Sequence, residues 1–414
     1  MAELYALTRR QLLLASGVLF AWAYLPKAAL AEGRDPRLLV IILRGALDGL
    51  SAVAPVGDPN WVQLRGDSAL TTDGANPALR LDGFFALNAA MPNFHRLYTA
   101  GQATILHATA TPYRDRSHFD GQDVLESGFP KPGNVESGWL NRALTALAPA
   151  DRVSDQNQSA VAVGATTPLV VRGPAQVLSW TPPTLPAASD DTLMRLLDLY
   201  RHSDPALAHA LEERIGIAAV VGAEPTRTSK GASRGRGGVE AVRAFFAQSA
   251  GAAAKFLARP NGPRIGAISF EGWDTHANEG SHDGRLAALL GALDGAVAAI
   301  QAEMATAWRE TVVAVITEFG RTAQLNGSAG TDHGTATVAL LAGGAVRGGR
   351  VISDWPGLKT AQLHHGRDLR PTTDLRAVLK GLLKDHLRIP DDVLATHVFP
   401  GSAGVPPMSG LVAA

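Results

Sequence analysis

Four short segments of the sequence combine glycine with acidic or imidazole side chains, which are the residue types that hold divalent cations in proteins. The segments are residues 44–49, 271–278, 318–321 and 331–334. Their candidate metal ligands are Asp48, Asp274, His276, Glu318, Asp332 and His333. A mixture of carboxylate oxygens and imidazole nitrogens suits zinc, manganese or a similar ion better than calcium. The chain has no cysteine, which excludes disulfides, thiolate ligands and a thiol nucleophile.

Each segment taken alone also has a plainer structural interpretation. Asp48 stands before a glycine, as turn residues often do. Asp274 could cap a following helix and leave His276 on the surface. Residues 332–333 could form one hydrogen-bonded pair. Glu318 ends an apolar run, where an isolated buried carboxylate is costly, so it favours a functional interpretation more than the others.

Residues 112–123 form a further polar segment, with Ser117 at the expected start of a helix. A helix N-terminus favours an anionic group, and Arg114 and Arg116 could hold a phosphate or sulfate in bidentate fashion. His118 follows the serine directly. The alternative is that Ser117 only caps the helix inside an ordinary salt-bridged surface loop.

The elements that would position these residues alternate along the chain. Six apolar runs predict buried strands at residues 38–43, 104–107, 160–163, 265–270, 311–317 and 337–342. Three-and-four spacing predicts a helix over residues 286–304, and residues 191–200, 239–258 and 374–387 have similar character. This alternation predicts an α/β fold with a mostly parallel central sheet and helices on both faces. The candidate ligands then meet at the carboxyl ends of the strands, where such sheets bind ligands.

The segments between and after these elements suggest how the chain is organised. A Pro-rich stretch at residues 181–190 and a Gly- and Ser-containing stretch at residues 224–238 bracket a helical insertion. We expect this insertion, residues 188–258, to lie beside the sheet as a cap. Residues 32–402 would form the main domain, and residues 403–414 a surface tail.

The N-terminal residues have the features of an export signal. Arg9 and Arg10 precede an apolar stretch, and residues 29–31 (ALA) fit a signal-peptidase site, so we expect residues 1–31 to be removed and the mature chain to start at Glu32. The arginine pair is typical of the twin-arginine signal, which implies the twin-arginine translocase as partner and a periplasmic or secreted protein. We expect no stable membrane span after processing; the alternative is an uncleaved N-terminal anchor. The balance of 38 basic and 38 acidic residues argues against a nucleic-acid partner.

Five motifs together resemble one bacterial exported family, the domain of unknown function family 1501. They are residues 39–51 (LVIILRGALDGLS), 113–122 (YRDRSHFDGQ), 272–278 (GWDTHAN), 317–322 (TEFGRT) and 331–334 (TDHG). That family is grouped with the alkaline phosphatase-like and sulfatase-like superfamily. The resemblance implies metal ions at the carboxyl edge of the sheet and a nucleophile at the position of Ser117.

The sequence departs from the superfamily pattern at two points. Where phosphatases and mutases have Asp-His at a strand end, this chain has Glu318 and Phe319, so one imidazole ligand is missing. Asp274 and His276 are also closer in sequence than the usual pair. The resemblance therefore implies one or two divalent ions, either zinc, manganese or magnesium.

Two functions of different classes follow from these residues. In the first, the protein is an exported metal-dependent hydrolase of small anionic phosphate or sulfate esters. Ser117 would attack, Arg116 and Arg321 would stabilise the developing charge, and His118 would orient the leaving group. In the second, it is a catalytically inactive family member that serves as a periplasmic binding or assembly factor.

Overall fold

The computed structural model describes residues 34–74, 76–147, 160–164, 166–182, 196–197, 199–201, 204–221 and 236–413. The chain divides into two units, Met1–Asp35 and Pro36–Ala414. The expected export signal, its cleavage site and most of both bracketing stretches lie outside the described residues.

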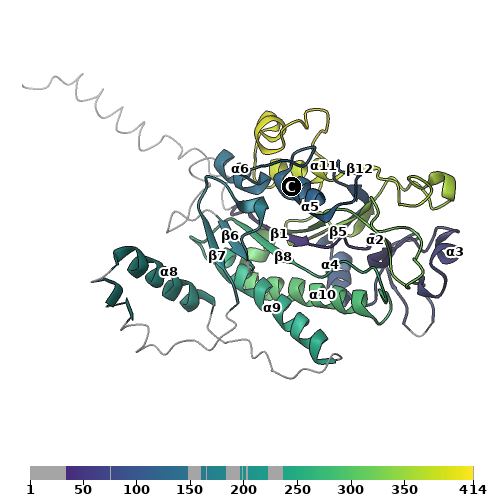
Figure 1. Ribbon diagram of the computed structural model, residues 1–414, viewed down its shortest axis with the longest axis horizontal. Coiled ribbons are helices and arrows are strands. Elements are labelled where there is room, and N and C mark those ends of the chain that lie inside the picture. Colours follow the sequence, from purple (N-terminus) through teal and green to yellow (C-terminus); the bar gives the residue numbers. More distant parts are fainter. Residues whose placement is uncertain are drawn as a thin grey trace, which may run out of the picture. The chain divides into compact units, whose positions relative to one another are not determined.

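A nine-stranded sheet forms the centre of the second unit (Figure 1). Its strands are β1 (Arg37–Leu43), β5 (Ala103–Ala110), β6 (Ala160–Val163), β7 (Val177–Trp180), β8 (Ile265–Phe270), β9 (Thr311–Thr317), β10 (Thr337–Ala342), β11 (Arg350–Ile352) and β12 (Thr373–Asp374). Their order is β11-β5-β10-β9-β1-β8-β6-β7, with β12 beside β5. All six predicted strands are present, while β7, β11 and β12 are additional.

The sheet is parallel except at β10, which runs antiparallel to both β5 and β9. The connection from β9 to β10, residues 318–336, contains no helix and returns the chain directly beside β9. Parallel neighbours are usually joined by a crossover that contains a helix. The predicted α/β class with a mostly parallel sheet is confirmed.

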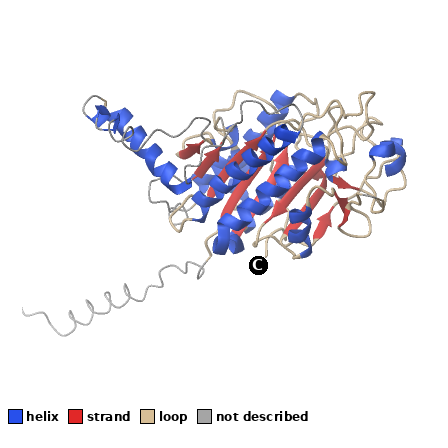
Figure 2. Ribbon diagram, turned by 90° about the horizontal axis from the view of Figure 1, so that it is seen from below, coloured by secondary structure: helices blue, strands red, loops and turns tan. Residues whose placement is uncertain are grey.

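Helices cover both faces of the sheet, and Figure 2 shows the helices that lie over one of them. The helices on one face are α4 (Pro92–Thr99), α9 (Arg236–Ala258) and α10 (Arg285–Met304). Those on the other face are α5 (His118–Ser127), α6 (Trp139–Ala146) and α11 (Leu375–Asp385). β1 shows why both faces are covered, because its apolar side chains alternate between them. Leu39 and Ile41 pack on the first face, and Leu38 and Val40 pack on the second.

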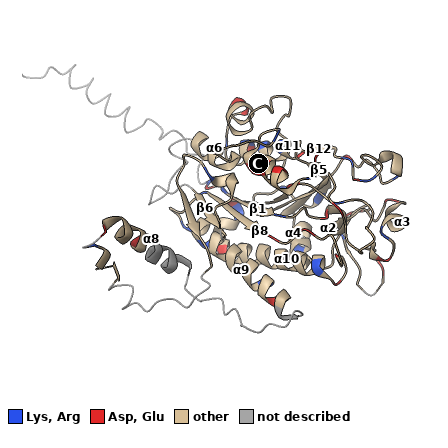
Figure 3. Ribbon diagram, in the orientation of Figure 1, with Lys and Arg blue, Asp and Glu red and all other residues tan. Residues whose placement is uncertain are grey.

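Shorter elements complete the fold. Three short strands, β2 (Val53–Ala54), β3 (Leu79–Arg80) and β4 (Ala86–Leu87), form a separate small sheet in the order β2-β4-β3. The remaining helices are α2 (Gly49–Ala52), α3 (Trp61–Arg65), α8 (Pro205–Val221) and α12 (Asp391–Val393). Lysines, arginines and acidic residues of the described elements are spread over the fold (Figure 3), in keeping with the balanced charge.

Two expectations about organisation differ from the structure. α9, the last part of the expected cap, belongs to the main core, because Phe246, Phe256 and Leu257 are buried against the sheet and α10. The expected surface tail is docked at its end, where Leu411 is fully buried and the Ala413 N–H donates to the Ala345 carbonyl. Apolar residues at both places favour burial over exposure.

Candidate metal centre

The candidate site lies where β1, β8 and β9 end and α5 begins. The loop after β8 carries Asp274 and His276, His118 is the first residue of α5, and His333 lies in the connection that leads to β10. Gly45, with φ of +117°, lets the turn after β1 approach this loop, since a Cβ there would lie 2.5 Å from the Asp274 nitrogen.

Three imidazole nitrogens converge on one carboxylate oxygen. The Nε2 atoms of His118, His276 and His333 lie 3.6, 3.1 and 3.5 Å from Asp274 Oδ1. The Nε2 atoms of His276 and His333 are 2.9 Å apart. Residues far apart in the sequence therefore meet within a few ångströms.

The other nitrogen of each imidazole faces an acceptor. His118 Nδ1 lies 2.9 Å from Glu318 Oε1, and His276 Nδ1 lies 3.3 Å from Asp332 Oδ1. His333 Nδ1 is 2.8 Å from the backbone carbonyl of Arg116. Carboxylates and carbonyls accept but do not donate, so we assign the proton to Nδ1 and the lone pair to Nε2 in each neutral ring.

This arrangement fits a single divalent cation. With the protons on Nδ1, the lone pairs of three nitrogens and a carboxylate oxygen face one another, an arrangement that a cation among them would stabilise, and metal-bound histidines usually donate their second N–H to such acceptors. Bonds of zinc to nitrogen place tetrahedral ligands about 3.3 Å apart, close to the separations found here. His118, Asp274 and His333 form a group that could hold a metal ion, and His118 Nε2 is buried without a hydrogen-bond partner among the described residues.

Glu318 lies behind the converging nitrogens and holds one of them in place. Its Oε1 accepts hydrogen bonds from the Gly45 N–H at 2.9 Å, from His118 and from Gln122 Nε2 at 3.2 Å. Burial alone would raise the pKa of Glu318, but these hydrogen bonds outweigh it and lower that pKa. The hydrogen bond to Glu318 in turn raises the pKa of His118.

Arg321 is buried among the loops that carry the site. Its Nε donates to the Ala46 carbonyl at 2.8 Å, and Nη1 and Nη2 donate to the carbonyls of Thr331 and Gly45 at 3.2 and 2.9 Å. Nη2 also pairs with Asp274 Oδ1. Burial raises the pKa of Asp274, but the hydrogen bond and charge of Arg321, together with the nearby His276 and His118, outweigh it and lower that pKa. The expected contact of Arg321 with a substrate is therefore replaced by contacts that fix Asp274 and three loops.

Arg116 and Ser117 sit beside the cluster with local partners. Arg116 Nη2 lies 2.7 Å from Asp368 Oδ2, so its guanidinium is already paired. Ser117 caps α5, because its Oγ accepts from the Asp120 N–H at 3.5 Å. The Ser117 N–H donates to the Tyr113 hydroxyl at 3.1 Å. These contacts fit the interpretation of Ser117 as a helix cap. Ser117 nevertheless lies at the site, because it directly precedes His118 in the chain.

Asp48 does not join the cluster. Its two oxygens lie 2.6 and 3.0 Å from Nη1 and Nη2 of Arg65, and both side chains are buried. The Arg65 charge lowers the pKa of Asp48 despite burial. Burial and the nearby Asp48 charge raise the pKa of Glu279. A guanidinium thus balances Asp48 where a metal ion was expected.

The structure divides the predicted residues into two roles. Asp274, His276 and His333 meet as expected, while Glu318 and Asp332 contact imidazole Nδ1 atoms instead of the centre. His118 was expected to orient a leaving group and instead belongs to the cluster. The position of His118 after a helix-capping serine does not indicate a role in metal binding, because the local sequence does not show which strand end a helix faces.

The fold and the site define an α/β protein with a candidate cation centre at the carboxyl edge of its sheet. The model of a family described as "Protein of unknown function (DUF1501)" matches residues 97–398, and the chain belongs to this family. This confirms the family that the five motifs indicated. A search of curated proteins found no match.

Several solved structures resemble the chain at low identity. A phosphonate monoester hydrolase of Agrobacterium radiobacter is 13% identical, with a TM-score of 0.37 over 86% of this chain and 74% of that one. BT1596, a 2-O GAG sulfatase, is 12% identical, with a TM-score of 0.40 over 86% and 71%. The PsFucS1 sulfatase from Pseudoalteromonas sp. is 12% identical, with a TM-score of 0.36 over 81% and 68%. Function has to be inferred from the site itself.

Proposed function

We propose that this protein is a metal-dependent hydrolase of small phosphate or sulfate esters. The observation that supports the proposal is the convergence of three imidazole Nε2 atoms and Asp274 Oδ1, with each Nδ1 held by an acceptor. His118, His276, His333 and Asp274 would hold one ion, with zinc or manganese suited to this donor set. When bound, such an ion supplies Lewis acidity and negative-charge stabilisation.

The other side chains of the site would orient the ligands and carry out the nucleophilic attack. Glu318 and Asp332 keep two of the imidazoles in orientation, and Arg321 keeps Asp274 in place. Ser117 is the proposed nucleophile: its Oγ would bond to phosphorus or sulfur as the bond to the ester oxygen breaks, its proton would pass to water, and the leaving alkoxide would take a proton from water and depart as the alcohol. Water would then hydrolyse the serine ester and return the hydroxyl.

A second function is favoured by the partners of the two expected substrate arginines. Arg116 is paired with Asp368, and Arg321 is saturated by carbonyls and Asp274. Ser117 already serves as a helix cap. A protein with these features could bind a metal ion without turnover and act as a periplasmic binding or assembly factor.

Metal analysis of the full chain tests the shared premise. We expect about one zinc or manganese per chain in the wild type, and a large loss in His118→Ala and His333→Ala. His397→Ala is the control, because His397 is exposed and contacts Thr145 away from the cluster. Equal metal content in all four proteins would rule out the proposed centre.

Ester turnover separates the two functions. Aryl phosphates, phosphonates and sulfates are offered to the metal-loaded protein and to Ser117→Ala. Turnover lost in the variant supports the serine mechanism, and turnover retained in the variant excludes Ser117 as nucleophile. Metal binding without turnover of any ester supports the binding factor.

We also propose that the protein is exported by the twin-arginine translocase and acts in the periplasm or outside the cell. The support is the Arg9–Arg10 pair followed by an apolar stretch. Replacing both arginines by lysine should keep the protein in the cytoplasm. N-terminal sequencing of the exported wild type should start at Glu32; a start at Met1 would indicate an uncleaved anchor.

A further inference from the structure

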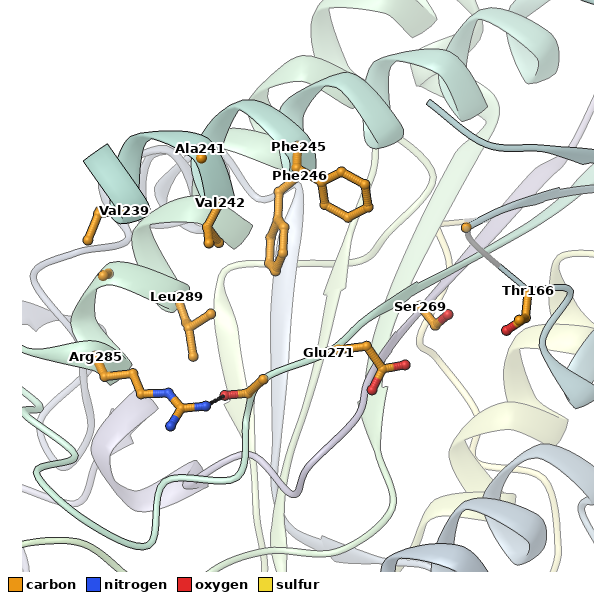
Figure 4. A pocket seen from close by; sticks show the side chains of 14 residues that line it. Thr166, Val239, Ala241, Val242, Phe245, Phe246, Ser269, Glu271, Arg285 and Leu289 are labelled. Atoms are coloured by element: carbon orange, nitrogen blue, oxygen red, sulfur yellow. Dashed lines mark hydrogen bonds between the residues drawn. The ribbon is translucent and has the colours of Figure 1, made fainter. Parts of the chain in front are cut away.

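An apolar cavity of about 700 Å³ reaches the start of the loop after β8, the loop that also carries Asp274 and His276 (Figure 4). It lies between α9, α10 and the residues that end or follow β6 and β8, which are Gly164, Thr166, Ser269, Glu271 and Gly272. Its volume is within the range of small-molecule sites in proteins, about 300–1,000 Å³.

The helices supply an apolar wall. Val242, Phe246 and Leu289 point into the same space in Figure 4, with Val239 and Phe245 beside them on α9. Phe245 is 37% exposed and Val239 is 36% exposed. Apolar side chains that face a concave space leave surface from which an apolar ligand would displace water.

Polar groups collect on the cavity wall formed by the loop after β8 and Arg285. Arg285 Nη2 donates to the Gly272 carbonyl at 2.8 Å, and Glu271 Oε1 lies 3.3 Å from Arg44 Nη1. Gly272 is separated from Asp274 by one residue, so their Cα atoms are no more than about 7.6 Å apart. The cavity is therefore apolar on the helix side and polar on the side of the loop that continues to Asp274.

We propose that this cavity binds the apolar organic group of the substrate while the anionic ester lies at the metal centre. The substrate class is then an aryl or branched-alkyl phosphate or sulfate, in contrast to a fully polar ester such as a sugar phosphate. This inference rests on the proposed function for the ester end, but the cavity itself can be tested without metal or turnover.

Binding of 2-naphthylmethanol, a neutral probe, tests the cavity alone. Ala241 lines the cavity on α9, so Ala241→Trp should fill it and weaken binding about tenfold or more. Ala244→Trp is the matched control, since Ala244 is exposed on the same helix and is not among the lining residues. Melting curves of both variants check that the fold is retained. Equal binding to both variants, or no binding to the wild type, would overturn the proposed cavity.

A pair of non-hydrolysable phosphonates tests the link to the metal centre. Methylphosphonate and 2-naphthylmethylphosphonate share one headgroup and differ in the apolar part. On the metal-loaded wild type we expect the naphthyl compound to bind about tenfold tighter or more than methylphosphonate, and tighter than 2-naphthylmethanol. Ala241→Trp should remove the advantage and leave methylphosphonate unchanged.

The two proposals fail in different ways. If 2-naphthylmethanol binds the cavity but the phosphonate headgroup adds nothing, the cavity does not serve the ester site and the inference is overturned. If the protein takes up no metal, the proposed hydrolase fails, and binding of the neutral probe still decides whether the cavity holds an apolar ligand.

Discussion

At the scale of single residues, the two nitrogens of each imidazole in the cluster have different tasks. Nε2 faces the centre, and Nδ1 is fixed by Glu318, Asp332 or the Arg116 carbonyl. A fixed ring loses less conformational freedom when a cation binds, so these acceptors should contribute to metal affinity. The buried acceptor, Glu318, should matter more than the half-exposed Asp332.

Replacing Glu318 by glutamine tests this role. Gln Oε1 can still accept from Gly45 and His118, and its NH₂ can donate to Thr317 Oγ1, which lies 2.9 Å from Glu318 Oε2. The fold should therefore persist while the negative charge is lost. We expect metal affinity to fall about 10- to 100-fold, measured by competition with a chelating dye. An unchanged affinity would show that the Glu318 charge does not support the site.

Asp48→Asn tests whether Asp48 serves the fold or the metal. The substitution removes the charge that balances buried Arg65, so we expect a loss of about 3 kcal/mol in the free energy of unfolding. Urea denaturation measures this loss. Metal content of the folded protein should equal that of the wild type, and a metal-free but otherwise stable variant would contradict the structural role.

Much of the candidate site could be predicted from residue types alone. Asp274, His276 and His333 were recognisable because acidic and histidine residues stood beside glycines at expected strand ends. That Asp48 lies apart from these residues could not be predicted. Its partner is Arg65 on the short helix α3, and no motif in the sequence points to Arg65. Whether a carboxylate faces a metal or an imidazole Nδ1 depends on side-chain rotamers, which residue spacing does not determine.

At the scale of elements, the fit of α5 against the end of β9 positions His118. Gly121 of α5 lies against Phe319, where a Cβ would be 2.9 Å from the ring, and that ring stacks on His118 with centroids 5.1 Å apart. The glycine therefore lets the helix approach closely enough for His118 to reach the cluster.

Gly121→Ala should shift α5 or the Phe319 ring and lower metal affinity, although alanine favours a helix by about 1 kcal/mol. Gly295→Ala is the matched control on α10, because a Cβ there has open space around it. The control should raise the melting temperature and keep the metal. Metal titration of both variants tests this expectation. Normal metal binding by Gly121→Ala would contradict the positioning role of α5.

His107 links β5 of the large sheet to β2 of the small one and should make this contact sensitive to pH. Its Nε2 donates to the Val53 carbonyl at 3.0 Å, and burial lowers its pKa to about 4. Because the unfolded chain binds the proton more tightly, with a pKa of about 6.5, stability should be full above pH 6.5 and fall by about 3 kcal/mol as the pH drops to 4. Urea denaturation across this range should show a weaker dependence in His107→Gln. Parallel curves for the two proteins would contradict the assignment.

The strongly patterned elements were predictable, and the short ones were not. Six buried strands and the α10 helix appear where continuous apolar runs and three-and-four spacing place them. β11 and β12 are only 3 and 2 residues long, too short to show a period. The antiparallel direction of β10 depends on how the connection after β9 returns, which strand composition does not reveal.

At the scale of the whole molecule, the candidate centre connects segments that are distant in the chain. His118 comes from α5, Asp274 and His276 from the loop after β8, and His333 from the connection to β10. Unfolding would separate these residues, so an ion bound by all of them should have little affinity for the unfolded chain. A bound ion therefore stabilises the native state by mass action.

Removal of the ion should consequently destabilise the entire second unit and not only the site. With free metal about 1,000 times above its dissociation constant, binding adds about 4 kcal/mol to the free energy of unfolding. Calorimetry should show a single transition that moves down by several degrees with a chelator and returns when zinc or manganese is restored. His333→Ala should melt at one temperature with or without chelator, because it lacks one of the converging nitrogens. A chelator effect of equal size in His333→Ala would place the stabilising ion elsewhere in the molecule.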